Sequence, residues 1–183
     1  MSQWICSKLC KPPGVISGIT EGNDGIIYFT VESSLKIFKL VHDGFDTKHE
    51  LVLEGTANGR HHSFHGIVWN EKNNTFYICD WSGHGVFQYT PKATNISHFA
   101  GCVQGKESEH EDGSILLARF SHPDRLDIDQ DGNLYLTEGT YVRKIQDGIV
   151  STLAGTGQKS HKDGKANEAA VNTPHGIAVS KDG

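Results

Sequence analysis

The chain has 183 residues, of which 36% are hydrophobic, 21% are charged and 21 are glycines. This composition is typical of a glycine-rich globular β protein and excludes a disordered chain. The formal net charge is −5 and the Lys and Arg residues are scattered, which argues against nucleic-acid binding. No apolar run is long enough to span a membrane, and the first residues lack the apolar core of a secretory signal. We therefore expect a cytoplasmic protein with no membrane contact.

Residues 1–13 form a lead-in outside the repeats that follow. Cys6 and Cys10 form a CxxxC pair, but no second pair follows at the spacing of a zinc site. We expect these two residues, with Cys79 and Cys102, to be free thiols. The N-terminal pair is a candidate for redox chemistry.

Residues 14–183 repeat one pattern of short strands and turns. Successive copies cover about 14–56, 64–102 and 121–155, and a partial copy covers 172–183. Pro123 and Leu126 recur as Pro174 and Ile177 at one spacing of 51 residues. No stretch has sustained helical periodicity. In the third copy, turn residues such as Asp-Gly separate four expected strands: Arg125–Asp129, Asn133–Glu138, Val142–Gln146 and Ile149–Ala154.

A repeat of this length with four short strands predicts a β-propeller blade. The phrases GNLYLTEGTYVRKIQDGIVSTLAGTGQ and NTPHGIAVSKDG closely resemble the NHL repeat family. The resemblance implies that the PHGIAV-like strand is innermost and the VSTLAG strand outermost. The third strand has Thr140-Tyr141-Val142-Arg143 where the family has an Asn-His-Arg phrase.

Three blades and one extra inner strand make an incomplete ring, so we expect an all-β, NHL-type propeller that does not close. Three explanations are open. The chain is a fragment of a longer protein, two copies complete one ring as a homodimer, or the C-terminal residues close against the N-terminal segment. The chain stops at Gly183 inside an expected hairpin turn, which favours a fragment.

The residues that begin the inner strands are the candidate site. Alignment of the copies places Ser17, His65, Asp124 and His175 at one position. Inner strands converge on the propeller axis, so two histidines and a carboxylate would share one rim, a set that suits Zn²⁺ or another divalent metal. The phrases around His65 and His175 also resemble the Pro-His phrases of the peptide-amidating lyase, a propeller enzyme, and this resemblance implies zinc binding by these two histidines only. The alternative is that each histidine caps a turn or lines a wet channel.

Trp81, next to Asp80 near a strand end, is the candidate recognition residue, with burial between blades as the alternative. The acidic tract Glu107–Asp112 lacks the residue order of a calcium-binding loop. We expect that tract to be a solvated insertion between blades.

The leading hypothesis is a non-enzymatic interaction scaffold that binds a protein or peptide through one propeller face, with no cofactor. The alternative is a metal-dependent propeller enzyme, a lyase or lactonase-like hydrolase. In that case His65, Asp124 and His175 would hold the metal and polarise a substrate oxygen or a bound water.

Overall fold

The structure is a computed structural model that describes residues 13–42, 46–55, 62–101 and 110–180. Over these ranges it contains strands and turns and no helix, so the predicted all-β class is confirmed. A helix long and apolar enough to cross a membrane is likewise not found among them. Cys6, Cys10 and Cys102 lie outside the described residues. The strands are β1 (Ile16–Glu21), β2 (Ile27–Val31), β3 (Lys36–His42), β4 (Thr47–Glu54), β5 (Phe64–Asn70), β6 (Thr75–Asp80), β7 (Gly85–Tyr89), β8 (Ser97–Ala100), β9 (Gly113–Ser114), β10 (Pro123–Ile128), β11 (Leu134–Glu138), β12 (Tyr141–Gln146) and β13 (Ile149–Ala154).

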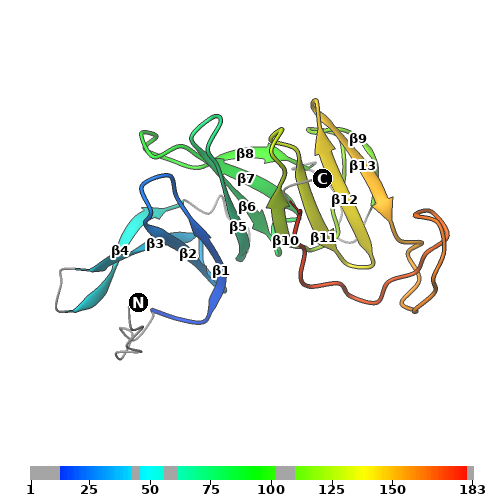
Figure 1. The fold of residues 1–183 in the computed structure, drawn as a ribbon, viewed down its shortest axis with the longest axis horizontal. Coiled ribbons are helices and arrows are strands. Elements are labelled where there is room, and N and C mark those ends of the chain that lie inside the picture. The colour runs from blue at the N-terminus through cyan, green and yellow to red at the C-terminus, as the bar shows by residue number, and fades with distance from the viewer. Residues whose placement is uncertain (1–12, 43–45, 56–61, 102–109, 181–183) are drawn as a thin grey trace.

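The strands form three antiparallel sheets, each a meander of consecutive strands. The first contains β1 to β4, the second β5 to β8, and the third β10 to β13 with β9 added beyond β13. Figure 1 shows the sheets in chain order, from blue and cyan through green to yellow. β5 packs against β1 on one side and against β10 on the other, which is the arrangement of successive propeller blades around an axis. The four strands expected in the third copy are observed, with ends that differ by at most two residues.

Apolar side chains fill the interfaces between neighbouring sheets. Phe64, Phe76 and Ile78 lie between the first and second sheets, and each is 1% exposed or less. Val86 and Leu136 are fully buried between the second and third sheets. Burying one such side chain stabilises a fold by about 1.5–3 kcal/mol. The alternating apolar residues of the repeat therefore hold one blade against the next.

Glycines allow the inner strands to approach each other closely. A Cβ on Gly66 would lie 2.9 Å from the backbone of both Asp124 and Arg125, which is closer than real Cβ atoms come. Gly18 holds the same place in β1, and a Cβ there would collide with the carbonyl oxygen of His65. These close contacts bring the starts of the first three inner strands to one rim.

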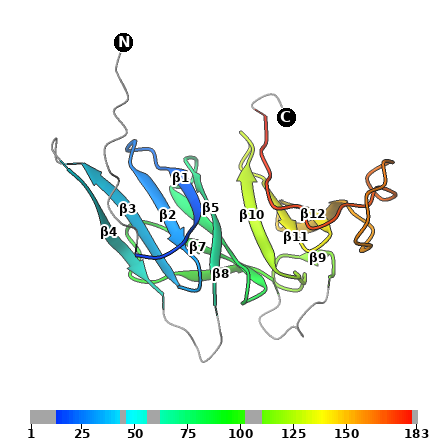
Figure 2. The same cartoon turned by 90° about the horizontal axis from the view of Figure 1, so that it is seen from below.

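The position of a fourth inner strand is occupied by residues 174–180, which run beside β10 (Figure 2). The N–H of Val179 donates to Asp127 at 2.7 Å, and the hydroxyl of Thr137 donates to the carbonyl oxygen of His175 at 3.4 Å. Residues 172–180 contain no assigned strand, because the described part of the chain offers no second strand to pair with them. The three sheets do not close into a ring.

The connections between blades also repeat at the spacing of 51 residues. Glu111 pairs with Arg119 in an isolated bridge before the third blade, and Lys162 pairs with Ala170 in the next connection. A turn lies inside each bridge and is closed by an N–H to C=O hydrogen bond of 2.8 Å. The sequence spacing therefore reflects a repeated loop as well as repeated strands.

Candidate functional site

The side chains that begin the inner strands meet at one rim. His65 Nδ1 lies 2.7 Å from Oδ1 of Asp124, and His175 Nδ1 lies 2.6 Å from Oδ2 of the same carboxylate. Asp124 is buried, whereas the side chain of His175 is 76% exposed. Ser17 takes a different partner, since its hydroxyl donates to the carbonyl oxygen of Phe64 at 2.7 Å. We call the group of His65, Asp124 and His175 the Asp124 cluster.

Asp124 accepts all the hydrogen bonds at the centre of this cluster. Its Oδ1 also accepts from Arg125 Nη1 at 2.6 Å. Burial disfavours the charged carboxylate, but the hydrogen bonds from His65 and His175 and the charge of Arg125 outweigh it and hold the pKa of Asp124 below its ordinary value. Both histidines use Nδ1 on the carboxylate, which leaves Nε2 as the nitrogen available to a ligand.

This geometry is that of a hydrogen-bonded cluster and differs from a metal cage. In the described ranges, no group of three or more His, Cys, Asp or Glu side chains is placed to hold a metal ion. Asp124, predicted as the third ligand, has both oxygens engaged by nitrogen donors. Metal binding by His65, Asp124 and His175 therefore stays a prediction.

Trp81 lies on the same rim, directly after β6, and is 40% exposed. Its ring stacks on His65, with 5.7 Å between centroids and 13° between planes, and contacts His122 at 4.2 Å. His84 contacts His122 at 4.5 Å. Trp81 is therefore half-exposed within a row of four rings, which we call the aromatic row.

A pocket of about 270 Å³ lies beside the aromatic row. Most of the lining residues are polar: Glu32, Ser33, His62, Ser63, His65, Trp81 and Ser82. Hydroxyl, imidazole and carboxylate groups next to one indole suit a ligand with both polar and flat apolar parts, such as a peptide.

A second pocket, of about 310 Å³, lies on the axial side of the inner strands. Its apolar wall includes Ile19 from β1, Ile67 from β5, Leu126 from β10 and Ile177 from the fourth inner segment. Arg125 is the one charged residue among those that line it. We call this space the axial pocket.

Asp80 and Glu138 are buried acidic residues that tie the second strand of a blade to the start of its inner strand. Asp80 accepts the N–H of Ser63 at 2.9 Å, and Glu138 accepts the N–H of Ser121 at 2.7 Å. Asp80 also bonds to the ring of His62. Sequence reasoning missed this role, although both acidic residues close the equivalent strand of their blade. They fix the backbone beneath the rim.

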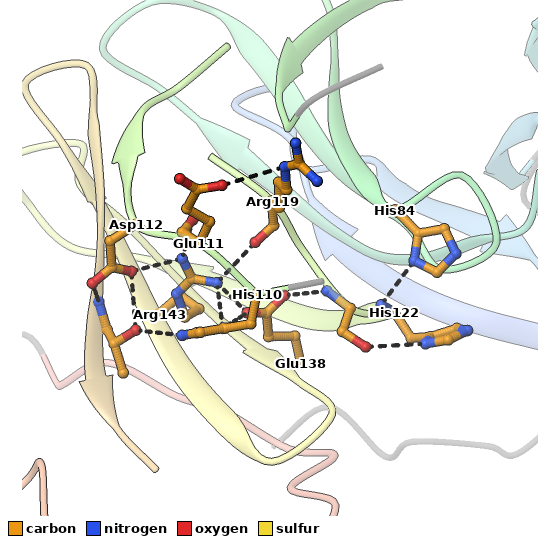
Figure 3. Close-up of polar contacts among 10 residues, drawn as sticks. His84, His110, Glu111, Asp112, Arg119, His122, Glu138 and Arg143 are labelled. Carbon is orange, nitrogen blue, oxygen red and sulfur yellow. Dashed lines mark hydrogen bonds and ion pairs between the residues drawn. The ribbon is translucent and has the colours of Figure 1, made fainter. Parts of the chain in front are cut away.

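A buried guanidinium connects the third blade to the loop that precedes it (Figure 3). Arg143 in β12 is fully buried and forms ion pairs with Glu138 and, at 2.7 Å, with Asp112. It also donates to the carbonyl oxygens of Glu111 at 3.0 Å and Arg119 at 3.2 Å. These contacts hold the connecting loop against the blade.

The described end of the acidic tract, which was expected to be a solvated insertion, is exposed at Glu111 and Asp112 but is also docked on the third blade. Asp112 accepts from the backbone N–H and the hydroxyl of Thr152. Burial disfavours its charged form, but these bonds and Arg143 outweigh it and lower the pKa of Asp112. His110 stacks on Tyr141 with 3.6 Å between ring centroids. Local sequence patterns could not predict this docking, because the partner, Arg143, lies 31 residues away from Asp112. Residues 107–109 lie outside the described ranges.

Cys79 is a free, fully buried thiol in β6. Burial, reinforced by the nearby carboxylate of Asp124, raises the pKa of this thiol well above its ordinary value. A buried, protonated thiol is a poor nucleophile. Cys79 is therefore a packing residue.

The fold and its repeated units define part of a β-propeller. No family model matches the chain. It is 31% identical over 102 residues to Teneurin-m of Drosophila melanogaster, a match that covers 49% of this chain and 4% of that protein. It is 40% identical over 77 residues to Protein SUPPRESSOR OF QUENCHING 1, chloroplastic, of Arabidopsis thaliana, covering 39% of this chain and 7% of that protein. The chain thus spans a small part of the length of both curated relatives.

Solved structures share the fold over most of the chain. A structural genomics protein of unknown function from Bacteroides thetaiotaomicron superposes with a TM-score of 0.75 at 25% identity, covering 88% of this chain and 41% of that chain. A chain in a nidogen/laminin complex superposes with a TM-score of 0.57 at 18% identity, covering 78% of this chain and 49% of that chain. At that identity the second likeness is one of fold alone.

Proposed function

We propose that this chain is an NHL-type propeller segment that acts as an interaction scaffold and binds a protein or peptide through the rim that carries Trp81. The NHL assignment is supported by the repeated sequence phrases and by the blade architecture. Binding is supported by the nidogen/laminin complex, in which a chain of similar fold is seen with a protein partner.

The observation that carries this proposal is the half-exposed Trp81 beside the 270 Å³ pocket. Tryptophan is enriched among the residues that dominate binding energy at interfaces. The indole is held in place by His65 and His122, and a fixed side chain loses little conformational entropy when a partner binds.

Panning of a random peptide library displayed on phage against the purified chain would test this proposal. Enriched peptides should bind the wild type, and Trp81→Ala should weaken their binding by about tenfold or more, as expected for the loss of an anchor residue. Ile149→Ala is the matched control, because Ile149 is 51% exposed and lies on β13 of a different blade. No enrichment, or peptides that bind both variants equally, would contradict the proposal.

A metal-dependent propeller enzyme is the second candidate. The observation that favours it is the Asp124 cluster, in which two imidazoles each have Nδ1 on a carboxylate. Carboxylates orient metal-binding histidines in this way, so His65 and His175 could present Nε2 to zinc while Asp124 holds their rings. A bound divalent metal would supply a Lewis acid there.

Metal analysis and thermal unfolding separate the two candidates. The enzyme candidate requires about one metal ion per chain after purification, or an increase in the melting temperature with added Zn²⁺. The double variant His65→Ala/His175→Ala should lose either effect. A folded protein that carries no metal and gains no stability from Zn²⁺ would exclude the metal-dependent enzyme.

A further inference from the structure

The third blade breaks the glycine pattern of the inner strands. The residue directly before Ile19, Ile67 and Ile177 is glycine in each case, at positions 18, 66 and 176. The same position in the third blade, before Leu126, is Arg125. One blade of the repeat therefore carries the largest basic side chain where the others carry none.

The hydrogen bond to the next inner segment is longer in the blade that carries Arg125. The hydroxyl of Thr30 in the first blade reaches the carbonyl oxygen of His65 at 2.5 Å across Gly18. The hydroxyl of Thr137 in the third blade reaches the equivalent carbonyl oxygen, that of His175, only at 3.4 Å. Residues that break the local pattern of a fold are often found at functional sites, and Arg125 is such a residue.

Arg125 lines the axial pocket, and its guanidinium has N–H donors beyond those that bond to Asp124. Among the described residues, the guanidinium donates through Nη1 alone, to the carbonyl and Oδ1 oxygens of Asp124. Arginine has five N–H donors in a planar fork that matches a carboxylate. The charge of Asp124 is at the same time shared with His65 and His175. Nε and Nη2 therefore remain for a second anion.

Apart from Arg125 and Ser17, the side chains that line the axial pocket are apolar. Ile16 and Ile19 of β1 stay 46% and 64% exposed, and Ile67, Leu126 and Ile177 complete the wall. The volume of about 310 Å³ is at the lower end of the range of small-molecule sites, about 300–1,000 Å³. A single cation above an aliphatic wall is complementary to a small molecule or chain end that has one negative charge and an apolar body.

We propose that the axial pocket binds an aliphatic carboxylate, with Arg125 pairing with the carboxylate and the isoleucine wall holding the hydrocarbon. Two sources carry this chemistry, a free short-chain acid and the C-terminus of a peptide with an aliphatic last residue. The site shares no lining residue with the Trp81 pocket, and its proposal does not depend on peptide binding at the rim.

Isothermal titration calorimetry on the full chain tests the proposal with four probes. Hexanoate represents the free acid, and hexylammonium has a similar chain with the opposite charge. An N-acetylated tetrapeptide that ends in Ile-Leu is used as the free acid and as the C-terminal amide. Hexanoate, the peptide acid, or both should bind, and neither hexylammonium nor the peptide amide should bind measurably.

Two pairs of variants locate the binding. Arg125→Gln should weaken binding by about tenfold or more, as expected for the loss of a charged hydrogen bond, while Arg125→Lys should keep part of the affinity. Ile19→Glu adds a negative charge at an exposed wall position and should abolish binding, whereas Ile19→Gln should change it by only a few-fold. The second pair keeps the test valid if Arg125 is needed for folding.

Each outcome of the titrations either identifies the kind of carboxylate that binds or overturns the proposal. Binding of hexanoate alone assigns the pocket to a small acid, and binding of the peptide acid alone assigns it to a chain terminus. The proposal is overturned if neither acid binds, if the ammonium or amide probes bind equally well, or if Ile19→Glu leaves the affinity unchanged. A failure here leaves the Trp81 proposal intact, because that proposal is tested by a different variant.

Discussion

Replacement of Arg143 by alanine tests whether the buried network holds the third blade to its connecting loop. The substitution removes a guanidinium that is fully buried and leaves Glu138, also fully buried, without its cationic partner. Breaking a buried ion pair from one side costs about 3–5 kcal/mol. We expect the lower half of this range, because the N–H of Ser121 and the ring of His110 still bond to Glu138. In a chain of this size each kcal/mol lowers the melting temperature by about 2–4 °C.

The assay is urea unfolding followed by circular dichroism, with the free energy of unfolding compared among variants. Ile149→Thr is the control at an exposed position and should change the free energy by no more than about 0.5 kcal/mol. Arg143→Met combined with Glu138→Gln removes both charges and should be more stable than Arg143→Ala, because no buried charge is left unpaired. A loss below about 0.5 kcal/mol for Arg143→Ala would refute this reasoning.

Four further results are expected. Gly66→Ala should cost about 1–3 kcal/mol in urea unfolding, because its Cβ meets the neighbouring backbone. The lowered pKa of Asp124 contributes stability that is present above its ordinary pKa of 3.8 and is lost as the pH falls through the lower folded pKa, so the stability difference between wild type and Asp124→Asn should shrink in that acidic range. Cys79 should resist iodoacetamide in the folded protein and react after unfolding, as read by peptide mass spectrometry. If two copies complete one ring, light scattering should give twice the 20.1 kDa of the chain.

The fold could be predicted because the strands and turns of each repeat follow from local sequence patterns. The strands of the third copy alternate apolar and polar residues or contain short apolar runs, and turn formers separate them, so the observed strand ends differ from the expected ones by at most two residues. β9 could not be predicted in this way. It contains only Gly113 and Ser114, and it exists because the connecting loop docks on β13.

The candidate site could be predicted in part. Alignment of the copies identified His65, Asp124 and His175 as residues of one rim, since equivalent positions of converging strands must lie close together. It could not show that the carboxylate would accept from both rings and from Arg125. It also could not show the partners of Arg143, which come from distant parts of the chain and depend on tertiary packing.

The open arrangement of the sheets has a consequence for how the molecule unfolds. Within the described residues, the second sheet is packed against a neighbouring sheet on both faces, through Phe76 and Ile78 on one side and Val86 on the other. Stability in a linear array of repeats is approximately a sum over neighbouring interfaces, so the first and third sheets each depend on one interface and the second on two. The backbone amides of β6 should therefore exchange with solvent last, with fraying from both outer sheets inward.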